Sequence, residues 1–297
     1  MYLNDSSSKP IAARSNWQTV FSERRGSPDC IAHQPCFSLC TGTVWEGCGF
    51  LSRFAEKRQR VHEPHDHFDG RKHSFGPVMR VSIDEALKRK CPRTALGCVT
   101  AQVEAASAPP ELLADMHARV DEMLKLPNPR GVLESPGITA TRAAYKALGK
   151  DPARYRGSAE ALLRRVLAGK GLPQINAVVD VINLVSVESR LSIGLYDLAH
   201  ISGDIIFRAG RAGETYKGIG KYDLNLEGLP VFCDQQGPHG SPTSDSERTM
   251  VTAHTRHIIA AIISFGGKDA LEQWTERLTD LFQRYGAGNS LQQEIIT

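Results

Sequence analysis

The sequence lacks the features that would place it in several common classes. Its 297 residues contain no apolar run of about 18 residues, so no membrane-spanning helix and no membrane partner are expected. The first ten residues, MYLNDSSSKP, have no apolar segment typical of a secretory signal. A soluble globular protein in the cytoplasm is therefore the expectation.

Signatures of catalysis and nucleotide binding are also missing. There is no GxSxG elbow, no Walker loop and no dinucleotide-binding glycine pattern. Four histidines, His200, His239, His254 and His257, stand in no diagnostic context for a Ser-His-Asp triad. Nucleotide hydrolysis is not indicated, no catalytic nucleophile can be named, and no cofactor is expected.

Cysteine usage argues against both disulfides and zinc. An odd number of cysteines, seven, is spread irregularly along the chain, which fits reduced thiols. Four of them stand six, four and eight residues apart, whereas structural zinc sites normally use closer pairs. No metal site is therefore expected in this group, which comprises Cys30, Cys36, Cys40 and Cys48 with His62, His65, His67 and His73.

Residues 1–78 differ from the rest of the chain. They show no sustained apolar period of 2 or 3.6, which predicts a poorly structured extension. Met79 is followed at once by the patterned segment RVSIDEALKRK, so a misassigned start is an alternative. We expect a folded domain over 79–297, and a native peptide mapping before Met79 would exclude the later start.

Charge is nearly balanced except in one segment. Residues 79–297 contain 26 basic and 25 acidic residues, but residues 142–170 contain eight basic and two acidic ones. This segment is either a solvated helix face or a surface that follows phosphates. In the second case the RNA-binding candidates are Arg154, Arg156, Arg164, Arg165 and Lys170.

Apolar periodicity predicts a mixture of helices and strands. A strand is expected at 96–103 and helices at 111–126, 138–148, 159–168 (capped by Ser158) and 175–187. Short strands follow at 204–208, 216–219 and 230–234, strand and helix compete over 250–265, and an amphipathic helix over 268–285 ends the pattern. Strands and helices do not alternate regularly, which favours an α+β fold.

The helix at 175–187 is apolar nearly all round, which predicts that it is buried. Apolar residues cover both broad sides, Ile175, Val178, Val179, Ile182 and Val185 on one and Ala177, Val181 and Leu184 on the other. The remaining stripe consists of Asn176, Asp180 and Asn183, which need hydrogen-bond partners if buried. Either they bond nearby backbone and fix the helix, or they also line a ligand pocket.

A second polar cluster, the polar loop, occupies residues 240–249 with the sequence GSPTSDSERT. Serine and threonine often bond their own backbone, so one interpretation is a self-bonded loop. The other is a set of small donors and acceptors that holds an amino acid, a ribose or a phosphate. Its candidate pocket residues are Ser241, Thr243, Ser244, Asp245, Ser246, Arg248 and Thr249.

The order of these motifs resembles the B3/B4 domain of the phenylalanyl-tRNA synthetase β subunit. The resemblance runs through LPQINAVVDVINLVSVE, GLYDLAHISGDIIFRAGRAGETYKGIG, VFCDQQG and the polar loop as far as Thr255. It implies a mixed module with a β-sheet core flanked by helices. In the synthetase this module hydrolyses tyrosine mischarged on the phenylalanine tRNA.

By motif position, Asn176 and Asp180 match the family's helix signature, and Tyr196 with Asp197 match its aromatic-acid pair. Two departures stand out. Gly194 replaces a histidine, and the strand over 258–264 lacks an acid that helps to recognise tyrosine.

The resemblance leaves several functions open. The first is a tRNA-binding deacylase that edits aminoacyl-tRNA in trans, with Asp245 and Thr249 as catalytic candidates and Asn176 orienting the amino acid or water. The second is a non-catalytic module that binds tRNA or an amino acid. The third is a structural or partner-docking role.

Overall fold

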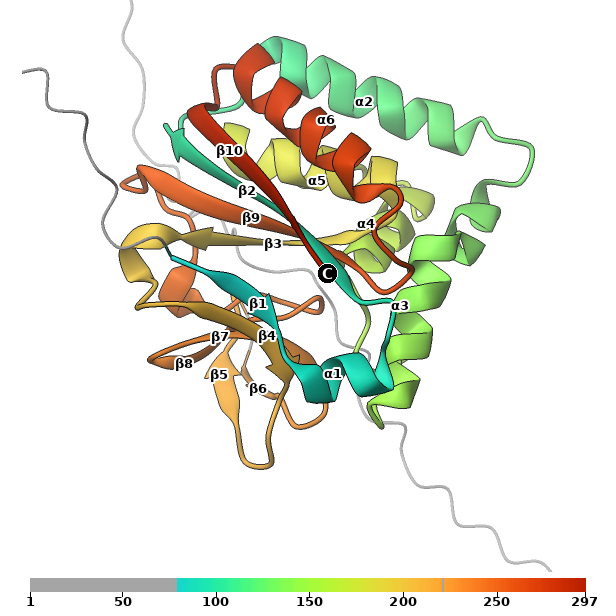
Figure 1. Cartoon of the computed structure of the whole chain (residues 1–297). Helices are drawn as coiled ribbons and strands as arrows, with labels where there is room; N and C mark the ends of the chain where they lie inside the picture. Colours follow the sequence, from blue (N-terminus) through green and yellow to red (C-terminus); the bar gives the residue numbers. More distant parts are fainter. Residues whose placement is uncertain (1–78, 221) are drawn as a thin grey trace, which may run out of the picture. The chain divides into compact units, whose positions relative to one another are not determined.

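The computed structural model describes residues 79–220 and 222–297. Helices α2, α5 and α6 lie on one side of a stack of sheets, and strands β5 to β8 lie on the other (Figure 1). The helices are α1 (Glu85–Lys90), α2 (Pro110–Leu124), α3 (Pro136–Ala147), α4 (Ser158–Leu167), α5 (Ala177–Ser189) and α6 (Leu271–Arg284), with short 3-10 turns η1 (Pro129–Glu134), η2 (Leu198–His200) and η3 (Glu247–Thr249).

The strands form two four-stranded sheets and a small ribbon. An antiparallel sheet has the order β10-β2-β9-β3, and a mixed sheet has the order β1-β4-β7-β8, in which β1 and β4 run parallel. Strands β5 and β6 pair with each other. Their bounds are β1 (Val81–Ile83), β2 (Ala95–Val103), β3 (Ser192–Asp197), β4 (Ile205–Ala209), β5 (Thr215–Lys217), β6 (Asp223–Asn225), β7 (Pro230–Asp234), β8 (Gly237–Gly240), β9 (His257–Ser264) and β10 (Gly288–Ile296).

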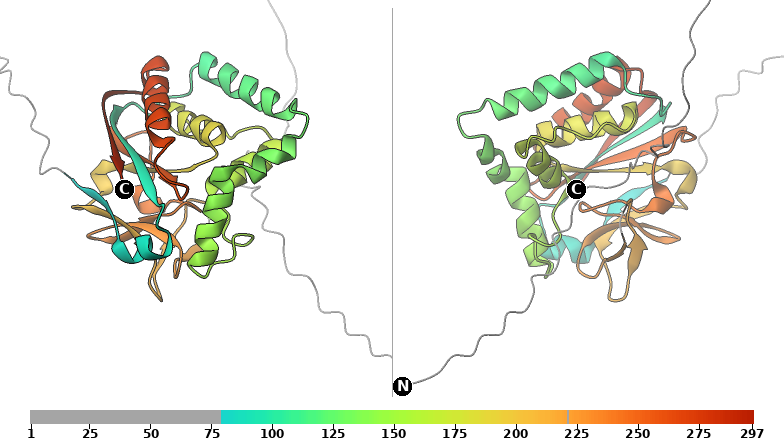
Figure 2. Two further views of the ribbon diagram at one scale, coloured as in Figure 1. Left: turned by 45° about the vertical axis from the view of Figure 1, so that its right-hand side comes forward. Right: turned by 180° about the vertical axis from the view of Figure 1, so that it is seen from behind.

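The main core lies between the antiparallel sheet and a layer of helices. In β9, Ile258, Ala260 and Ile262 face the helices α2, α4, α5 and α6, and alternate residues face the other way. Both faces of this central strand are buried, which explains its unbroken apolar sequence. Strand therefore prevails over helix in the ambiguous segment 250–265. Figure 2 shows the same layers from two other sides.

A second core fills the space between the two sheets. It contains residues of β2 and β9 from one sheet and Ile205, Phe207 and Phe232 from the other. The rings of Tyr196, Phe207, Phe232 and His239 form a chain of aromatic contacts there, with centroid separations of 4.4 to 5.5 Å between neighbours. The space between the sheets is therefore packed with side chains.

The observed elements confirm the α+β fold and most predicted helices, with several corrections. Ser158 is the first residue of α4 rather than its cap, because Gly157 holds the cap position and the Ser158 amide donates to the Pro242 carbonyl. Ile175 precedes α5 and is 60% exposed, so it is not part of the buried surface.

Helix α6 is not the last secondary-structure element of the chain. Strand β10 follows and pairs with β2, although its polar sequence gave no strand signal. Strands β1, β3, β6 and β8 were also absent from the sequence-based expectation. No helix in the described part of the chain is long and apolar enough to cross a membrane.

Candidate functional site

The polar loop is held from outside by three tyrosines that come from different elements. Tyr145 of α3 shares a hydrogen bond of 2.8 Å with the Thr243 hydroxyl, and Tyr216 of β5 donates to the Ser244 carbonyl at 2.6 Å. The third, Tyr196 of β3, faces Asp245. Burial raises the pKa of each of these phenols, and for Tyr196 the charge of Asp245 raises it further. All three hydroxyls therefore keep their protons at neutral pH.

Within the polar loop the hydroxyls bond to nearby backbone. Ser241 Oγ donates to the Ser244 carbonyl at 2.9 Å, and Thr249 Oγ1 donates to the His239 carbonyl at 3.3 Å. Ser246 and Thr249 also share a hydrogen bond of 3.4 Å. Both are buried. These contacts are those of a self-bonded loop.

Asp245, the other catalytic candidate, is engaged with the backbone of two strands. Its Oδ2 accepts from the Leu195 amide at 3.2 Å, and its carbonyl accepts from the Ile219 amide at 3.0 Å. Asp245 therefore joins the loop to β3 and to the segment after β5, which is a positioning role.

Two residues of the polar stripe likewise accept hydrogen bonds from backbone amides at the start of α5. Asn176 is the N-cap and accepts from the Val179 amide at 3.0 Å, while Asp180 Oδ1 accepts from the Ile175 amide at 2.9 Å. Burial raises the Asp180 pKa to about 6. Asn183 is half-buried. These bonds agree with the interpretation that the stripe fixes the helix.

The described part of the chain contains two cavities, and neither joins the polar stripe of α5 to the polar loop. The larger cavity lies between α2, α5 and α6, and the smaller lies between α3, α4 and the start of β3. Neither cavity is lined by a residue of the stripe or the loop. Their assignment to one substrate pocket remains a prediction.

Gly194 leaves no room for a larger side chain. Gly194 and Tyr196 lie on the same face of β3, and the Tyr196 side chain turns back over the glycine. A Cβ atom at Gly194 would lie 2.7 Å from Tyr196 Cζ, and one at Gly240 would lie 2.5 Å from the same atom. The tyrosine ring therefore occupies space that larger residues would need at both positions.

Three of the eight basic residues in the segment 142–170 surround one buried acid. The side chain of Glu160 in α4 is only 4% exposed and receives Arg142, Arg156 and Arg164 at 2.7, 3.3 and 2.7 Å. Burial alone would raise the Glu160 pKa, but the hydrogen bonds from Arg142 and Arg164 outweigh it and lower the pKa. Two of the five RNA-binding candidates, Arg156 and Arg164, are thus partly neutralised.

The other three candidates differ in exposure. Arg154 and Lys170 are exposed, and Arg165 is half-buried with its Nε atom enclosed. Phosphate binding by this segment remains a prediction, and it now depends mainly on Arg154 and Lys170.

An exposed histidine paired with a buried acid stands at the end of β3. His200 of η2 is 54% exposed, and its Nδ1 lies 3.5 Å from Oδ2 of Asp197. The same Oδ2 accepts from the Thr255 hydroxyl at 2.6 Å, and Oδ1 accepts from the Ala199 amide at 2.9 Å. Thr255 in turn accepts from the Thr252 amide at 2.9 Å. We call Asp197, His200 and Thr255 the histidine site.

Arg248 of the polar loop fixes the backbone of the histidine site. Its guanidinium donates to the His200 carbonyl at 2.9 Å and to both oxygens of Asp234 at 2.9 and 3.0 Å. Burial would raise the Asp234 pKa, but the Arg248 and Ser202 bonds lower it. The pair therefore links η2, η3 and the turn between β7 and β8.

His200 has no role predicted from the sequence. The signal was present as the i, i+3 pair in YDLAH. Thr255, 58 residues beyond Asp197, reaches the site only because β3 pairs with β9.

Comparison with known proteins finds a family match over one segment of the chain. A family model described as the B3/4 domain matches residues 140–285. The chain contains a B3/4 domain. Residues 1–139 and 286–297 lie outside this match, so β2 and β10 are outside the B3/4 segment although they complete its antiparallel sheet.

The curated relatives are synthetase subunits. The phenylalanine–tRNA ligase β subunit of Paramagnetospirillum magneticum is 34% identical over 83 residues, which cover 28% of this chain and 10% of that protein. The corresponding subunit of Brucella abortus is 31% identical over 77 residues, which cover 26% of this chain and 10% of that protein. The chain thus spans about a tenth of the length of these relatives.

Among solved structures, an N-terminal fragment of the phenylalanyl-tRNA synthetase β subunit from Pyrococcus horikoshii is similar at a TM-score of 0.39 and 14% identity. The alignment covers 74% of this chain and 51% of that fragment.

No group of three or more His, Cys, Asp or Glu side chains in the described part of the B3/4 protein is arranged to hold a metal ion. The predicted absence of disulfides concerns seven cysteines, of which Cys91, Cys98 and Cys233 are described and are free and buried. The remaining cysteines, with the histidines considered for zinc, lie outside the described residues.

Proposed function

We propose that this B3/4 protein binds aminoacyl-tRNA and hydrolyses its ester bond, with His200 as the general base. The observation that carries the proposal is the exposed His200 imidazole beside the buried Asp197 carboxylate. The relation to phenylalanine–tRNA ligase β subunits supports a tRNA-related substrate. The proposal moves the catalytic role from Asp245 and Thr249, which are bonded to the fold, to His200.

The chemistry follows from the geometry of the pair. Nδ1 of His200 lies 3.5 Å from Asp197 Oδ2, and in the proposed mechanism the other ring nitrogen takes a proton from water. The resulting hydroxide attacks the ester carbonyl carbon, the bond to the ribose oxygen breaks, and the proton passes from His200 to that oxygen. Asp197 stabilises the imidazolium that exists between these steps. It is a positioning residue, held by Thr255 and the Ala199 amide.

An arginine and a histidine beside the histidine site support binding of a nucleic acid end. Arg256 is exposed and donates to the Ala253 and Thr255 carbonyls, and His257 is exposed at the start of β9. Such groups contact phosphates and position the substrate. Arg154 and Lys170 stay candidates for contacts farther along the RNA.

One observation favours binding without hydrolysis as a second candidate. The Tyr196 ring fills the space beside Gly194 and Gly240, so the region of the missing histidine is closed by side chains. In that case the histidine site binds phosphate or the ribose but does not activate water.

The test is a deacylation assay of the full chain against a panel of mischarged tRNAs. We expect His200→Gln to lower the rate about 10²-fold or more, because removal of a general base typically costs roughly 10²- to 10⁴-fold. His254→Gln is the matched control, because His254 is also exposed and lies outside the histidine site. Thr255→Val should lower the rate less than His200→Gln.

Each outcome separates the candidates. An unchanged rate in His200→Gln would remove the histidine site from the mechanism. If wild type accelerates no deacylation but binds tRNA in a filter assay, with binding weakened by Arg256→Gln, the non-catalytic candidate stands. If wild type neither accelerates deacylation nor binds tRNA, a tRNA-related function is contradicted.

A further inference from the structure

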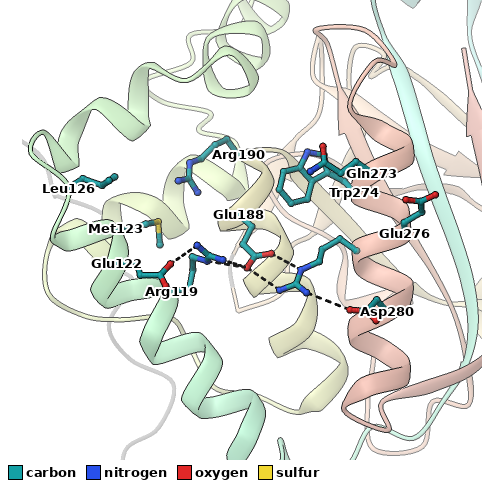
Figure 3. A pocket seen from close by; sticks show the side chains of 11 residues that line it. Arg119, Glu122, Met123, Leu126, Glu188, Arg190, Gln273, Trp274, Glu276 and Asp280 are labelled. Atoms are coloured by element: carbon teal, nitrogen blue, oxygen red, sulfur yellow. Dashed lines mark hydrogen bonds and ion pairs between the residues drawn. The ribbon is translucent and has the colours of Figure 1, made fainter.

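A cleft of about 640 Å³ opens between α2, the C-terminal end of α5 and α6. Its volume falls in the range of roughly 300–1,000 Å³ that is usual for small-molecule sites. Figure 3 shows the side chain of Arg190 and the indole of Trp274 directed into the space between α2 and α6. The cleft is separate from the histidine site and shares no residue with it.

The floor of the cleft is a buried acid that two arginines neutralise. Glu188 is 7% exposed and lies 3.0 Å from an Arg119 nitrogen and 3.1 Å from Arg277 Nε. Arg119 also pairs with Glu122 at 2.6 Å, and Arg277 pairs with Asp280 at 3.6 Å. The charges of Arg119 and Arg277 are therefore satisfied within the protein (Figure 3).

Arg190 is the cation that the protein leaves available. It ends α5 in the left-handed region, with φ of 65°, a conformation that turns the chain out of the helix and toward β3. One of its terminal nitrogens, Nη1, is buried and has no hydrogen-bond partner among the described residues. Burial and the nearby charge of Arg119 lower its pKa. A buried donor without a partner is costly, so the Arg190 guanidinium is the lining cation that would gain from an acceptor bound in the cleft.

The wall beside Arg190 suits an apolar group. Trp274 is only half-buried, while the other large apolar residues of α6, Leu271, Leu278, Leu281 and Phe282, are buried in the core. Met123 and the exposed Leu126 line the cleft as well. An indole and two flexible apolar side chains offer a flat surface for a ring or a short hydrocarbon.

We propose that this cleft is a binding site for a small organic monoanion, a carboxylate with an aromatic or apolar body. The carboxylate bonds the Arg190 guanidinium, and the body lies against Trp274. The lining contains three arginines and four acids, Glu122, Glu188, Glu276 and Asp280. The lining therefore carries a formal charge of −1, which disfavours a second negative charge on the ligand, and the attraction for one carboxylate comes from Arg190.

The experiment titrates the full chain with 3-phenylpropionate and follows tryptophan fluorescence and calorimetric heat. The chain contains three tryptophans, so Trp274→Phe assigns the optical signal. We expect saturable binding that weakens at least 10-fold when the probe is the neutral 3-phenylpropionamide. Propionate, which has no ring, and phenyl phosphate, which carries a second charge, are also expected to bind at least 10-fold more weakly.

Two arginine variants complete the test. Arg190→Gln is expected to weaken binding of 3-phenylpropionate at least 10-fold, since it removes the guanidinium and keeps an unbranched side chain. Arg93→Gln is the matched control, because Arg93 is 68% exposed and does not line the cleft. The comparison of acid and amide on wild type tests the proposal even if Arg190→Gln does not fold.

Several results would overturn the proposal. They are the absence of saturable binding, equal affinity for the acid and the amide, an unchanged affinity in a folded Arg190→Gln variant, or tighter binding of phenyl phosphate. None of these results bears on deacylation at His200, so the two proposals fail independently.

Discussion

Because Asp180 is buried, the free energy of unfolding depends on whether its carboxyl group is protonated. Its Oδ1 accepts one backbone bond, and its Oδ2 is buried with no hydrogen-bond partner among the described residues. Because the folded pKa, about 6, lies above the ordinary value of 3.8, the folded protein takes up this proton at a higher pH than the unfolded chain does. The contribution of Asp180 to the free energy of unfolding therefore increases as pH falls from 6 to 4 and is lost as pH rises.

Asp180→Asn should abolish this contribution. Between pH 7 and pH 4.5 the wild type gains roughly 2 kcal/mol from Asp180, whereas the variant gains nothing at this position. His239, whose pKa burial lowers to about 3, acts in the opposite direction but is the same in both proteins. Urea unfolding at the two pH values gives the difference, with the exposed Asp121→Asn as control. Parallel pH profiles for wild type and Asp180→Asn would contradict the prediction.

Gly194 is a position where the neighbouring Tyr196 ring leaves no space for a side chain. Gly194→Ala places a Cβ 2.7 Å from Tyr196 Cζ, so the tyrosine must move within a packed core. We expect a loss of about 1–3 kcal/mol in the free energy of unfolding, typical of overpacking. Gly266→Ala is the control, because the nearest atoms to a Cβ there are 3.8 Å away.

A double-mutant cycle identifies the cause of the Gly194 effect. In a Tyr196→Leu background, which removes the ring, Gly194→Ala should cost much less than in wild type. Equal costs in both backgrounds would show that Tyr196 is not the obstacle.

At the level of elements, Glu160 joins α3 to α4 and to the segment before α4. Arg142 of α3 donates to Glu160 through two nitrogens, at 2.8 and 2.7 Å, and Arg156 and Arg164 approach from either side along the chain. Removing the charge of Glu160 leaves three neighbouring cations without their shared partner. This is costly even though each arginine is partly exposed.

Glu160→Gln should therefore lower the free energy of unfolding by about 2 kcal/mol, below the roughly 3–5 kcal/mol typical of a fully buried pair. Because the folded pKa of Glu160 is lowered, its stabilisation exists above the ordinary value of 4.5 and disappears as pH falls below it. The variant and the wild type should thus converge in acid. Exposed Glu134→Gln is the control for urea unfolding, and a pH-independent difference would contradict the assignment.

At the scale of the molecule, the sequence predicts elements with strong periodicity and misses those without it. Helices α2 to α6 and strands β2 and β7 were found because their apolar residues recur regularly over many positions. Strand β3 contains a glycine and is buried on both faces, and β8, GPHG, has almost no apolar residue. Their positions come from sheet pairing, which no local pattern records.

The candidate sites likewise divide into those formed by residues close in sequence and those formed by distant segments. The pair Asp197 and His200 is visible in the sequence because it is local. The polar loop, in contrast, is anchored by tyrosines 98, 28 and about 50 residues away, and the cleft joins three helices from distant segments. A list of polar residues could not reveal that the loop bonds to itself, because that depends on which hydroxyls burial brings together.

Strand β10 offers a test of the whole fold. It pairs with β2 between Leu96 and Val103, with one register shift, and Leu291, Ile295 and Ile296 pack against the two cores. Truncation after Tyr285 removes these three half-buried side chains, worth roughly 1 kcal/mol each, and exposes the edge of β2. We expect the Tm to fall by about 6–12 °C, since each kcal/mol shifts it by roughly 2–4 °C in a domain of this size.

The exposed edge should also promote self-association, because β2 would present unpaired backbone groups along its length. Thermal denaturation and size-exclusion chromatography measure both effects. Removal of Thr297 alone, which follows β10 and is exposed, is the control. An unchanged Tm and a monomeric elution after truncation would mean that the antiparallel sheet is complete without β10, as the sequence pattern ending at residue 285 had implied.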